Sequence, residues 1–202
     1  MKVFRPTLVH HEPLLTALVY PTQYQLMYGL ARFQEFYENP ALQGRIFTRQ
    51  DVQDFQPDYY VRWNGCNFPA QVVDHFHDHY QEWRLDVHEE AALASMPRDR
   101  YIVGLHLGAD IQKVLLHERA HALFAASPQY REAVEKAWWA ELRADERATI
   151  QAELLGRGYS EKVVIDEWHA YRTAHDEWAG VPYPQALTDL QTKTFSRELE
   201  VQ

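Results

Sequence analysis

The stretch Ile111-Gln-Lys-Val-Leu-Leu-His-Glu-Arg-Ala-His-Ala-Leu-Phe124 is almost continuously apolar, yet it contains two histidines and a glutamate. It predicts a helix, in which His117 and His121 lie one turn apart on the same face. Their imidazoles would then point toward one position, and Glu118 would project beside them, where it could hold a metal-bound water. This H-E-x-x-H spacing is typical of a zinc hydrolase.

The surroundings of the motif strengthen the metal hypothesis. Gln112 and Arg119 mark the polar side of the predicted helix, and Glu118 lies away from that side, among apolar residues. A buried carboxylate without a partner costs several kcal/mol, so Glu118 needs one. The alternative is a buried, hydrogen-bonded histidine pair capped by Glu118.

A catalytic zinc usually has three protein ligands, so a third is expected downstream. Ser160 is a plausible cap for a helix that extends to about Trp178. Its apolar side consists of Val163, Val164, Trp168, Tyr171, Ala174 and Trp178. Glu167 lies in the middle of that side, which makes it the predicted ligand, with a buried salt bridge to an arginine as the alternative.

The other carboxylates and imidazoles downstream of His121 rank lower. The opposite side of the same helix consists of Lys162, Asp166, His169, Arg172, Thr173, Asp176 and Glu177, and it is predicted to face solvent. Glu141, Asp145 and Glu146 lie in a charged stretch that also indicates a solvated face. Upstream, His75 and His79 are four residues apart, but they are interpreted as a polar flank on a helix.

The motif His117-Glu118-x-x-His121, followed 46 residues later by Glu167, resembles the gluzincin branch of zinc metallopeptidases. Asp166-Glu167-Trp168-His169-Ala170-Tyr171 is similar to the E-x-x-A second motif of small gluzincins. The resemblance covers about 75 residues, from Tyr101 to His175. It implies a zincin-like fold in which Tyr101–Leu107 is an edge strand that binds extended peptide. Many gluzincins have an aspartate four residues after the ligand glutamate, and here that position is Tyr171.

The expected function is therefore that of a zinc metallopeptidase acting on a peptide or protein substrate. His117, His121 and Glu167 would bind Zn²⁺, and Glu118 would act as general base. A second electrophile is needed at the oxyanion; Tyr171 is the first candidate and His175 the second, with core packing as the alternative role. Two other functions use the same ligands: a non-haem Fe(II) oxygenase with a two-His-one-Glu facial triad, or a non-catalytic metal-stabilised interaction protein.

Composition narrows the class of protein. A chain of 202 residues with net charge −9 argues against nucleic acid and against an anionic membrane surface as partners. The single Cys66 excludes an internal disulfide and fits a reducing compartment. No apolar run has membrane-spanning length and the N-terminus lacks a secretory signal, so the cytoplasm is the expected location. The sequence leaves the oligomeric state and the natural substrate open.

The chain as a whole predicts an α+β, predominantly helical fold in one domain, residues 1–202, with a small β-element before the metal helix. Residues 1–21 are interpreted as an irregular N-terminal arm or short strand, and 101–178 as the metal-site core. Helices are expected over about 22–38, 69–95, 128–157 with a possible break near Ala140, and 185–199. Residues 58–63 are β-prone, and Asn64-Gly65 indicates a hairpin.

Overall fold

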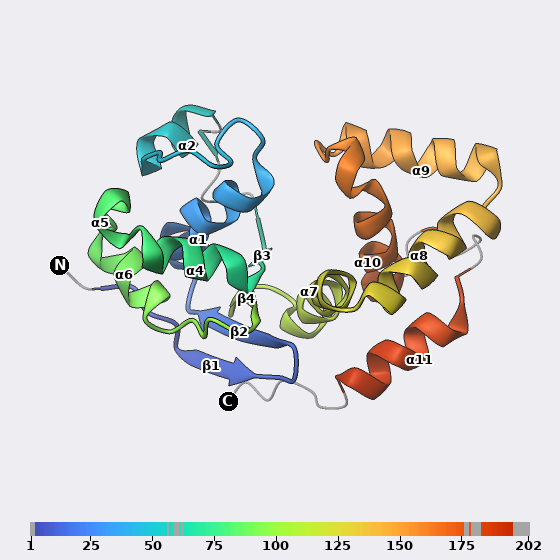
Figure 1. The fold of residues 1–202 in the computed structure, drawn as a ribbon, viewed down its shortest axis with the longest axis horizontal. Helices are drawn as coiled ribbons and strands as arrows, with labels where there is room; N and C mark the ends of the chain where they lie inside the picture. Colours follow the sequence, from blue (N-terminus) through green and yellow to red (C-terminus); the bar gives the residue numbers. More distant parts are fainter. Residues whose placement is uncertain are drawn as a thin grey trace. The chain divides into compact units, whose positions relative to one another are not determined.

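The computed structural model (Figure 1) describes residues 3–55, 57, 58, 61, 63–175, 178 and 183–195, except the side chains of Phe55 and His175. The chain divides into two compact units. Unit 1 comprises residues 1–114 with 199–202, and unit 2 comprises residues 115–198. The interpretation of the chain as one domain stays a prediction. The fold is α+β and mostly helical, as expected, whereas its likeness to zincins remains a proposal.

Unit 1 is built on a sheet with strand order β1-β2-β4-β3. The strands are β1 (Leu8–His11), β2 (Leu15–Tyr20), β3 (Gly65–Phe68) and β4 (Tyr101–His106). β2 is antiparallel to β1 and parallel to β4, and β3 is antiparallel to β4. Every residue of β2 and β4 is buried, and apart from Thr16 and His106 both strands are free of polar side chains, so neither shows the polar alternation of a half-exposed strand.

Two sequence predictions about these strands are wrong. Of the two interpretations of residues 1–21, the irregular arm is wrong and the strand is right, because this segment supplies β1 and the central strand β2. Their prolines misled the interpretation: Pro13 and Pro21 lie outside the strands, where a missing backbone donor costs nothing. Nor is β4 an edge strand, because it pairs with β2 on one side and β3 on the other. Among the described strands, the edges of this sheet are β1 and β3.

Helix α1 (Gln23–Glu38) packs on this sheet, and its prediction is confirmed. Thr22 caps its first turn by accepting a hydrogen bond from the backbone N–H of Gln25. The close approach depends on Gly104 in β4: a Cβ there would lie 2.5 Å from Cδ1 of Leu30 and 2.5 Å from Sγ of Cys66. A side chain at this position would therefore force Leu30, Leu26 or Cys66 to move, and glycine lets α1 pack closely on the strand.

The single helix predicted over 69–95 is instead three short ones: α4 (Ala70–Asp78), α5 (Tyr80–Trp83) and α6 (Val87–Leu93). The chain turns at Arg84, whose φ of 47° cannot continue a right-handed helix. Asp86 then starts α6 with a capping box in which Glu89 is the reciprocal partner. Preceding them is α2 (Arg49–Phe55).

β3 pairs with β4, which lies much further along the chain, and the hairpin predicted at Asn64-Gly65 stays a prediction. Most of the β-prone segment 58–63 lies outside the described residues.

Unit 2 is helical throughout its described part, and α7 crosses the boundary between the units. Its helices are α7 (Ile111–Ala126), α8 (Pro128–Ala140), α9 (Ala144–Gly156), the 3₁₀ turn η1 (Glu161–Val163), α10 (Val164–His175) and α11 (Gln185–Thr194). The break after Ala140 is confirmed. Ser127 caps α8 with Pro128 at its first position, as predicted. α10 packs against both α8 and α9. In the described part of the chain, no helix is both long and apolar enough to cross a membrane.

Candidate metal centre

Three potential metal ligands come together inside unit 2. His117 and His121 lie on α7, and Glu167 lies on α10, and one donor atom from each falls within 4.8 Å of the others. The two imidazole Nε2 atoms are 3.1 Å apart. Each lies 3.7 Å from one carboxylate oxygen of Glu167. Within the part of the chain that the structure describes, this is the one group of three such donors at metal-binding spacing.

The phase of both helices explains the convergence. On α7, the four-residue spacing puts His117 and His121 on one face, as predicted. On α10, Glu167 lies on the side turned toward that face, so the prediction that it joins the histidines is confirmed as a matter of geometry. Two imidazole nitrogens and one carboxylate are the donor set of many catalytic zinc sites, and the residues present fit that ion.

Asp166 adds a fourth polar group that the sequence interpretation had placed in solvent. Its Oδ1 lies 2.9 Å from Nδ1 of His121. A carboxylate on Nδ1 fixes the tautomer of the ring and leaves Nε2 free to face the other donors. Successive helical residues are 100° apart, so Asp166 and Glu167 can both border the site from different sides. The placement of Asp166 on a solvated face is therefore wrong.

The electrostatics of the cluster favour positive charge. Burial alone would lower the pKa of His121, but the nearby carboxylates of Asp166 and Glu167 outweigh burial and raise its pKa well above the usual value. Glu118 contributes in the same direction, so its carboxylate lies close enough to act on the cluster. Glu118 itself is buried, with 5% of its surface exposed. Burial and proximity to His121 agree with the predicted position of Glu118, and its role stays a proposal.

Tyr171 borders the cluster next to His117. The two rings meet edge to face, with centroids 4.7 Å apart. The Tyr171 hydroxyl lies 2.9 Å from the hydroxyl of Tyr159, and the Arg157 guanidinium lies 4.8 Å from the centroid of the Tyr171 ring. Burial raises the pKa of both tyrosines, so both hydroxyls stay protonated at neutral pH and can donate hydrogen bonds.

Tyr159 was missed at the sequence level. It stands between Gly158 and Ser160, in a turn that carries no periodic pattern. A large aromatic residue in a turn is itself a signal, because such a residue needs a place to be buried. The side chain of His175, the second oxyanion candidate, lies outside the described part of the structure.

His169 is the clearest error of the helical-phase argument. It was expected in solvent, yet it is fully buried. Its Nε2 lies 3.2 Å from the carbonyl oxygen of Ala120 on α7, and its ring stacks on Phe124 with centroids 5.2 Å apart. Burial lowers the pKa of His169 to about 4, so the ring is neutral at pH 7 and donates to that carbonyl.

The remaining sequence candidates are not part of the cluster. Asp145 and Glu146 each lie 3.3 Å from the exposed side chain of Arg143, and Glu141 is the C-cap residue of α8. His75 and His79 lie near each other on unit 1, with ring centroids 4.6 Å apart. His79 pairs with Glu82 at 3.0 Å.

Comparisons of this chain with protein-family models, with curated proteins and with solved structures return no match. A functional assignment therefore rests on the residues themselves and on the geometry of the His117–His121–Glu167 cluster.

Proposed function

We propose that this chain is a zinc-dependent metallopeptidase of the gluzincin type. The observation that carries the proposal is the convergence of His117, His121 and Glu167 within 4.8 Å, with Glu118 buried on the same helix. A purely structural ion pair needs neither two imidazoles aimed at one point nor a second carboxylate beside them. A hydrolytic metal site needs both, because the ligands hold the ion and the extra carboxylate handles the proton.

Each residue has a defined task in this proposal. His117, His121 and Glu167 would hold the zinc, and Asp166 orients His121 through Nδ1. The zinc would supply a Lewis acid and lower the pKa of a coordinated water toward 7. Glu118 accepts the proton of the attacking water and later delivers it to the leaving amine. The Tyr171 hydroxyl, held by Tyr159, is a donor for the oxyanion that forms at the scissile carbonyl.

The proposal is tested by metal analysis combined with a peptide-library cleavage assay. We expect about one zinc per chain after mild dialysis, following the three-ligand rule, and cleavage that a chelator abolishes and zinc restores. Iron as the bound metal, with activity that depends on O₂, would instead support a non-haem oxygenase, whose facial triad uses the same donors. Bound zinc without cleavage of any library peptide would contradict the peptidase proposal.

Replacing Tyr171 by phenylalanine tests the oxyanion role. If the hydroxyl stabilises the transition state, Tyr171→Phe should lower kcat by roughly 100-fold while KM and zinc content hold. The matched control is Tyr183→Phe, because Tyr183 is also partly buried in unit 2 and its hydroxyl lies 3.0 Å from the hydroxyl of Thr173, which is not a proposed ligand. Equal activity of the two variants would reduce Tyr171 to a packing residue.

A further inference from the structure

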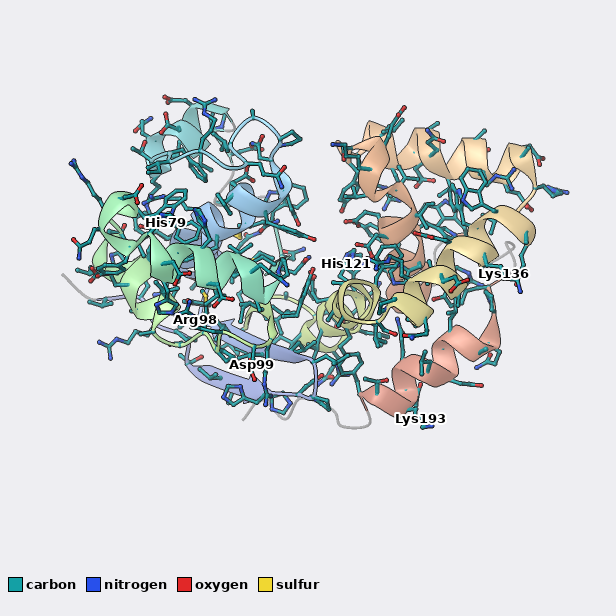
Figure 2. All side chains as sticks on the ribbon, in the orientation of Figure 1. His79, Arg98, Asp99, His121, Lys136 and Lys193 are labelled. Carbon is teal, nitrogen blue, oxygen red and sulfur yellow. The ribbon has the colours of Figure 1, made fainter. Side chains whose placement is uncertain are left out.

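A second pair of histidines lies in unit 1, outside the candidate metal centre. His75 belongs to the last turn of α4, and His79 is the C-cap residue where that helix ends (Figure 2). The backbone N–H of His79 donates to the carbonyl of His75 at 3.0 Å, so helical geometry extends through both residues. Their ring centroids are 4.6 Å apart, close to the 4.8 Å between the rings of His117 and His121. Both pairs therefore share the spacing by which a helix presents two imidazoles side by side.

The ring of His75 is held in place by aromatic neighbours. It stacks on Phe36 of α1, with centroids 4.4 Å apart and an angle of 17° between the planes. It also meets the ring of Trp83 edge to face, with centroids 5.9 Å apart. His75 is nevertheless only partly buried. A donor whose orientation is fixed in advance loses little conformational freedom when it binds, which favours affinity.

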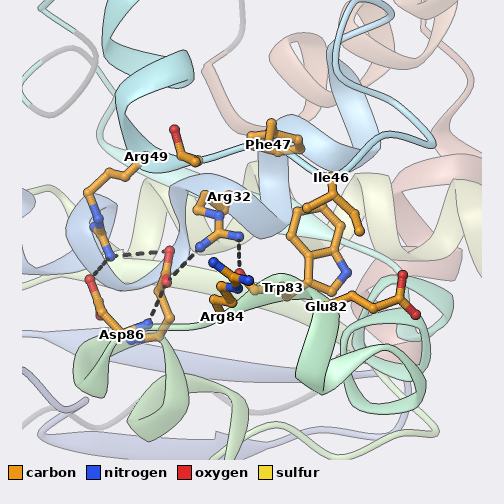
Figure 3. Close-up of a pocket in the computed structure, with 10 residues that line it drawn as sticks. Arg32, Ile46, Phe47, Arg49, Glu82, Trp83, Arg84 and Asp86 are labelled. Atoms are coloured by element: carbon orange, nitrogen blue, oxygen red, sulfur yellow. Dashed lines mark hydrogen bonds and ion pairs between the residues drawn. The ribbon is translucent and has the colours of Figure 1, made fainter.

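Glu82 orients the second ring. Its Oε1 lies 3.0 Å from Nδ1 of His79. A carboxylate on Nδ1 fixes the tautomer in which Nε2 carries a lone pair for a metal ion, as Asp166 does for His121 in the candidate metal centre. In the close-up of Figure 3 the side chain of Glu82 lies well apart from the ion pairs that Arg49 makes. Its carboxylate is therefore engaged with His79 rather than with that network.

The electrostatic surroundings of the pair favour a cation. Asp74 and Asp78 both bind the side chain of Arg98, at 2.6 and 2.7 Å, so two carboxylates share one guanidinium and a negative charge remains. Glu82 and Asp78 both lie close enough to act on the charge of His75. The C-terminal end of a helix also carries a partial negative charge, and both histidines lie at that end of α4.

We propose that His75 and His79 form a second metal site, which binds a divalent late transition-metal ion, Cu²⁺ more tightly than Zn²⁺. Imidazole nitrogens suit these ions, and Cu²⁺ binds a given set of nitrogen and oxygen donors more tightly than Zn²⁺ does. Mg²⁺ and Ca²⁺ are excluded because they take oxygen ligands. Water completes the coordination, and Glu82 stays the hydrogen-bond partner of His79.

The affinity of this site should be modest. It has half the protein ligands of a structural zinc site, which corresponds to a Kd on the order of 10 µM. Mild dialysis would therefore empty it, and the expected content of about one zinc per chain is unaffected.

The experiment titrates the full-length protein, as purified, with Cu²⁺ at about pH 7.5, where an ordinary imidazole is neutral. Isothermal titration calorimetry gives the affinity, electron paramagnetic resonance reports nitrogen ligands on the copper, and elemental analysis follows any metal already bound. We expect about one Cu²⁺ per chain with nitrogen ligation and a Kd on the order of 10 µM, without loss of the metal already bound. Zn²⁺ should bind the same site more weakly.

Four variants decide which residues hold the copper. His75→Gln and His79→Gln should each weaken Cu²⁺ binding by at least about 100-fold, and Glu82→Gln by about tenfold, because Glu82 acts only through His79. His77→Gln is the matched control, because it makes the same change on the same helix, two residues from each member of the pair, and it should leave the affinity unchanged.

Unchanged Cu²⁺ binding to His79→Gln would overturn the proposal, and the exposure of that side chain makes misfolding of this variant a poor explanation of a loss. An equal loss in His77→Gln would overturn it as well. Copper that enters only as the metal already bound leaves, and that His79→Gln does not affect, would belong to the other centre and would also refute a second site.

Discussion

Glu118→Gln is expected to lower kcat for peptide cleavage by at least about 100-fold while the protein keeps its zinc. In the proposed mechanism Glu118 does not coordinate the metal, so the ligand set His117, His121 and Glu167 is intact in the variant. Glutamine has nearly the same size and can stay in the buried position, but its amide cannot accept the proton of the attacking water. The measurement is kcat and KM on a peptide taken from the library screen, together with elemental analysis.

The control for this variant is Glu132→Gln, which makes the same chemical change on an exposed residue of α8. It should leave both activity and zinc content unchanged. Retention of full activity by Glu118→Gln would contradict the peptidase mechanism. A non-catalytic, metal-stabilised interaction protein predicts a different outcome, in which neither the wild-type protein nor the variant cleaves peptide while both keep their zinc and their stability.

Helix α7 could be predicted from sequence because the pattern that indicates it is local. The four-residue spacing of His117 and His121 fixes their common face once the segment is a helix, and the apolar run makes it one. The strands of the unit 1 sheet were harder to predict from sequence. β2 pairs with β4, more than eighty residues away, and such a pairing depends on contacts that no local pattern contains. A buried central strand also lacks the alternation by which strands are usually recognised.

Helix α10 shows where helical phase stops being informative about which residues face solvent. Glu167 was placed correctly on the face of α10 that meets His117 and His121, because it lies amid the apolar side of that helix. His169 and Asp166 were assigned wrongly, because the argument assumed that the opposite side faces water. In the structure α8 and α9 both pack on α10, and His169 packs against α7, so the helix is enclosed on more than one side. On a helix that is enclosed on several sides, a polar residue is more often hydrogen-bonded to a neighbouring element than exposed to solvent. The sequence of the helix alone does not show which neighbour that is.

Glu167→Ala is expected to lose most of the bound zinc and, with it, the activity. The carboxylate supplies the one ligand from α10, at 3.7 Å from the Nε2 atoms of both His117 and His121. Without it two imidazoles remain, one of which is also held by Asp166. Removing a residue that only hydrogen-bonds a metal ligand typically costs about 10–100-fold in metal affinity, so removing a ligand itself should cost more than about 100-fold. Zinc titration in competition with a chromophoric chelator measures this change directly.

Stability should follow the metal. If the wild-type protein is measured with free zinc about a thousandfold above its Kd, the bound ion adds about 4 kcal/mol to the free energy of unfolding, and Glu167→Ala loses most of that increment. Glu161→Ala is the matched control, because it removes an exposed carboxylate just before the same helix and should change neither quantity.

His169→Ala gives the opposite combination. It should destabilise the fold by about 2–3 kcal/mol, because it empties a fully buried position, while the ligand set stays complete. The imidazole of His169 also hydrogen-bonds the carbonyl of Ala120, so its loss affects stability as well. Zinc affinity is therefore the measurement that distinguishes His169→Ala from Glu167→Ala. A variant His169→Ala that loses zinc while Glu167→Ala keeps it would show that the third ligand has been misassigned, and the gluzincin proposal would fail with it.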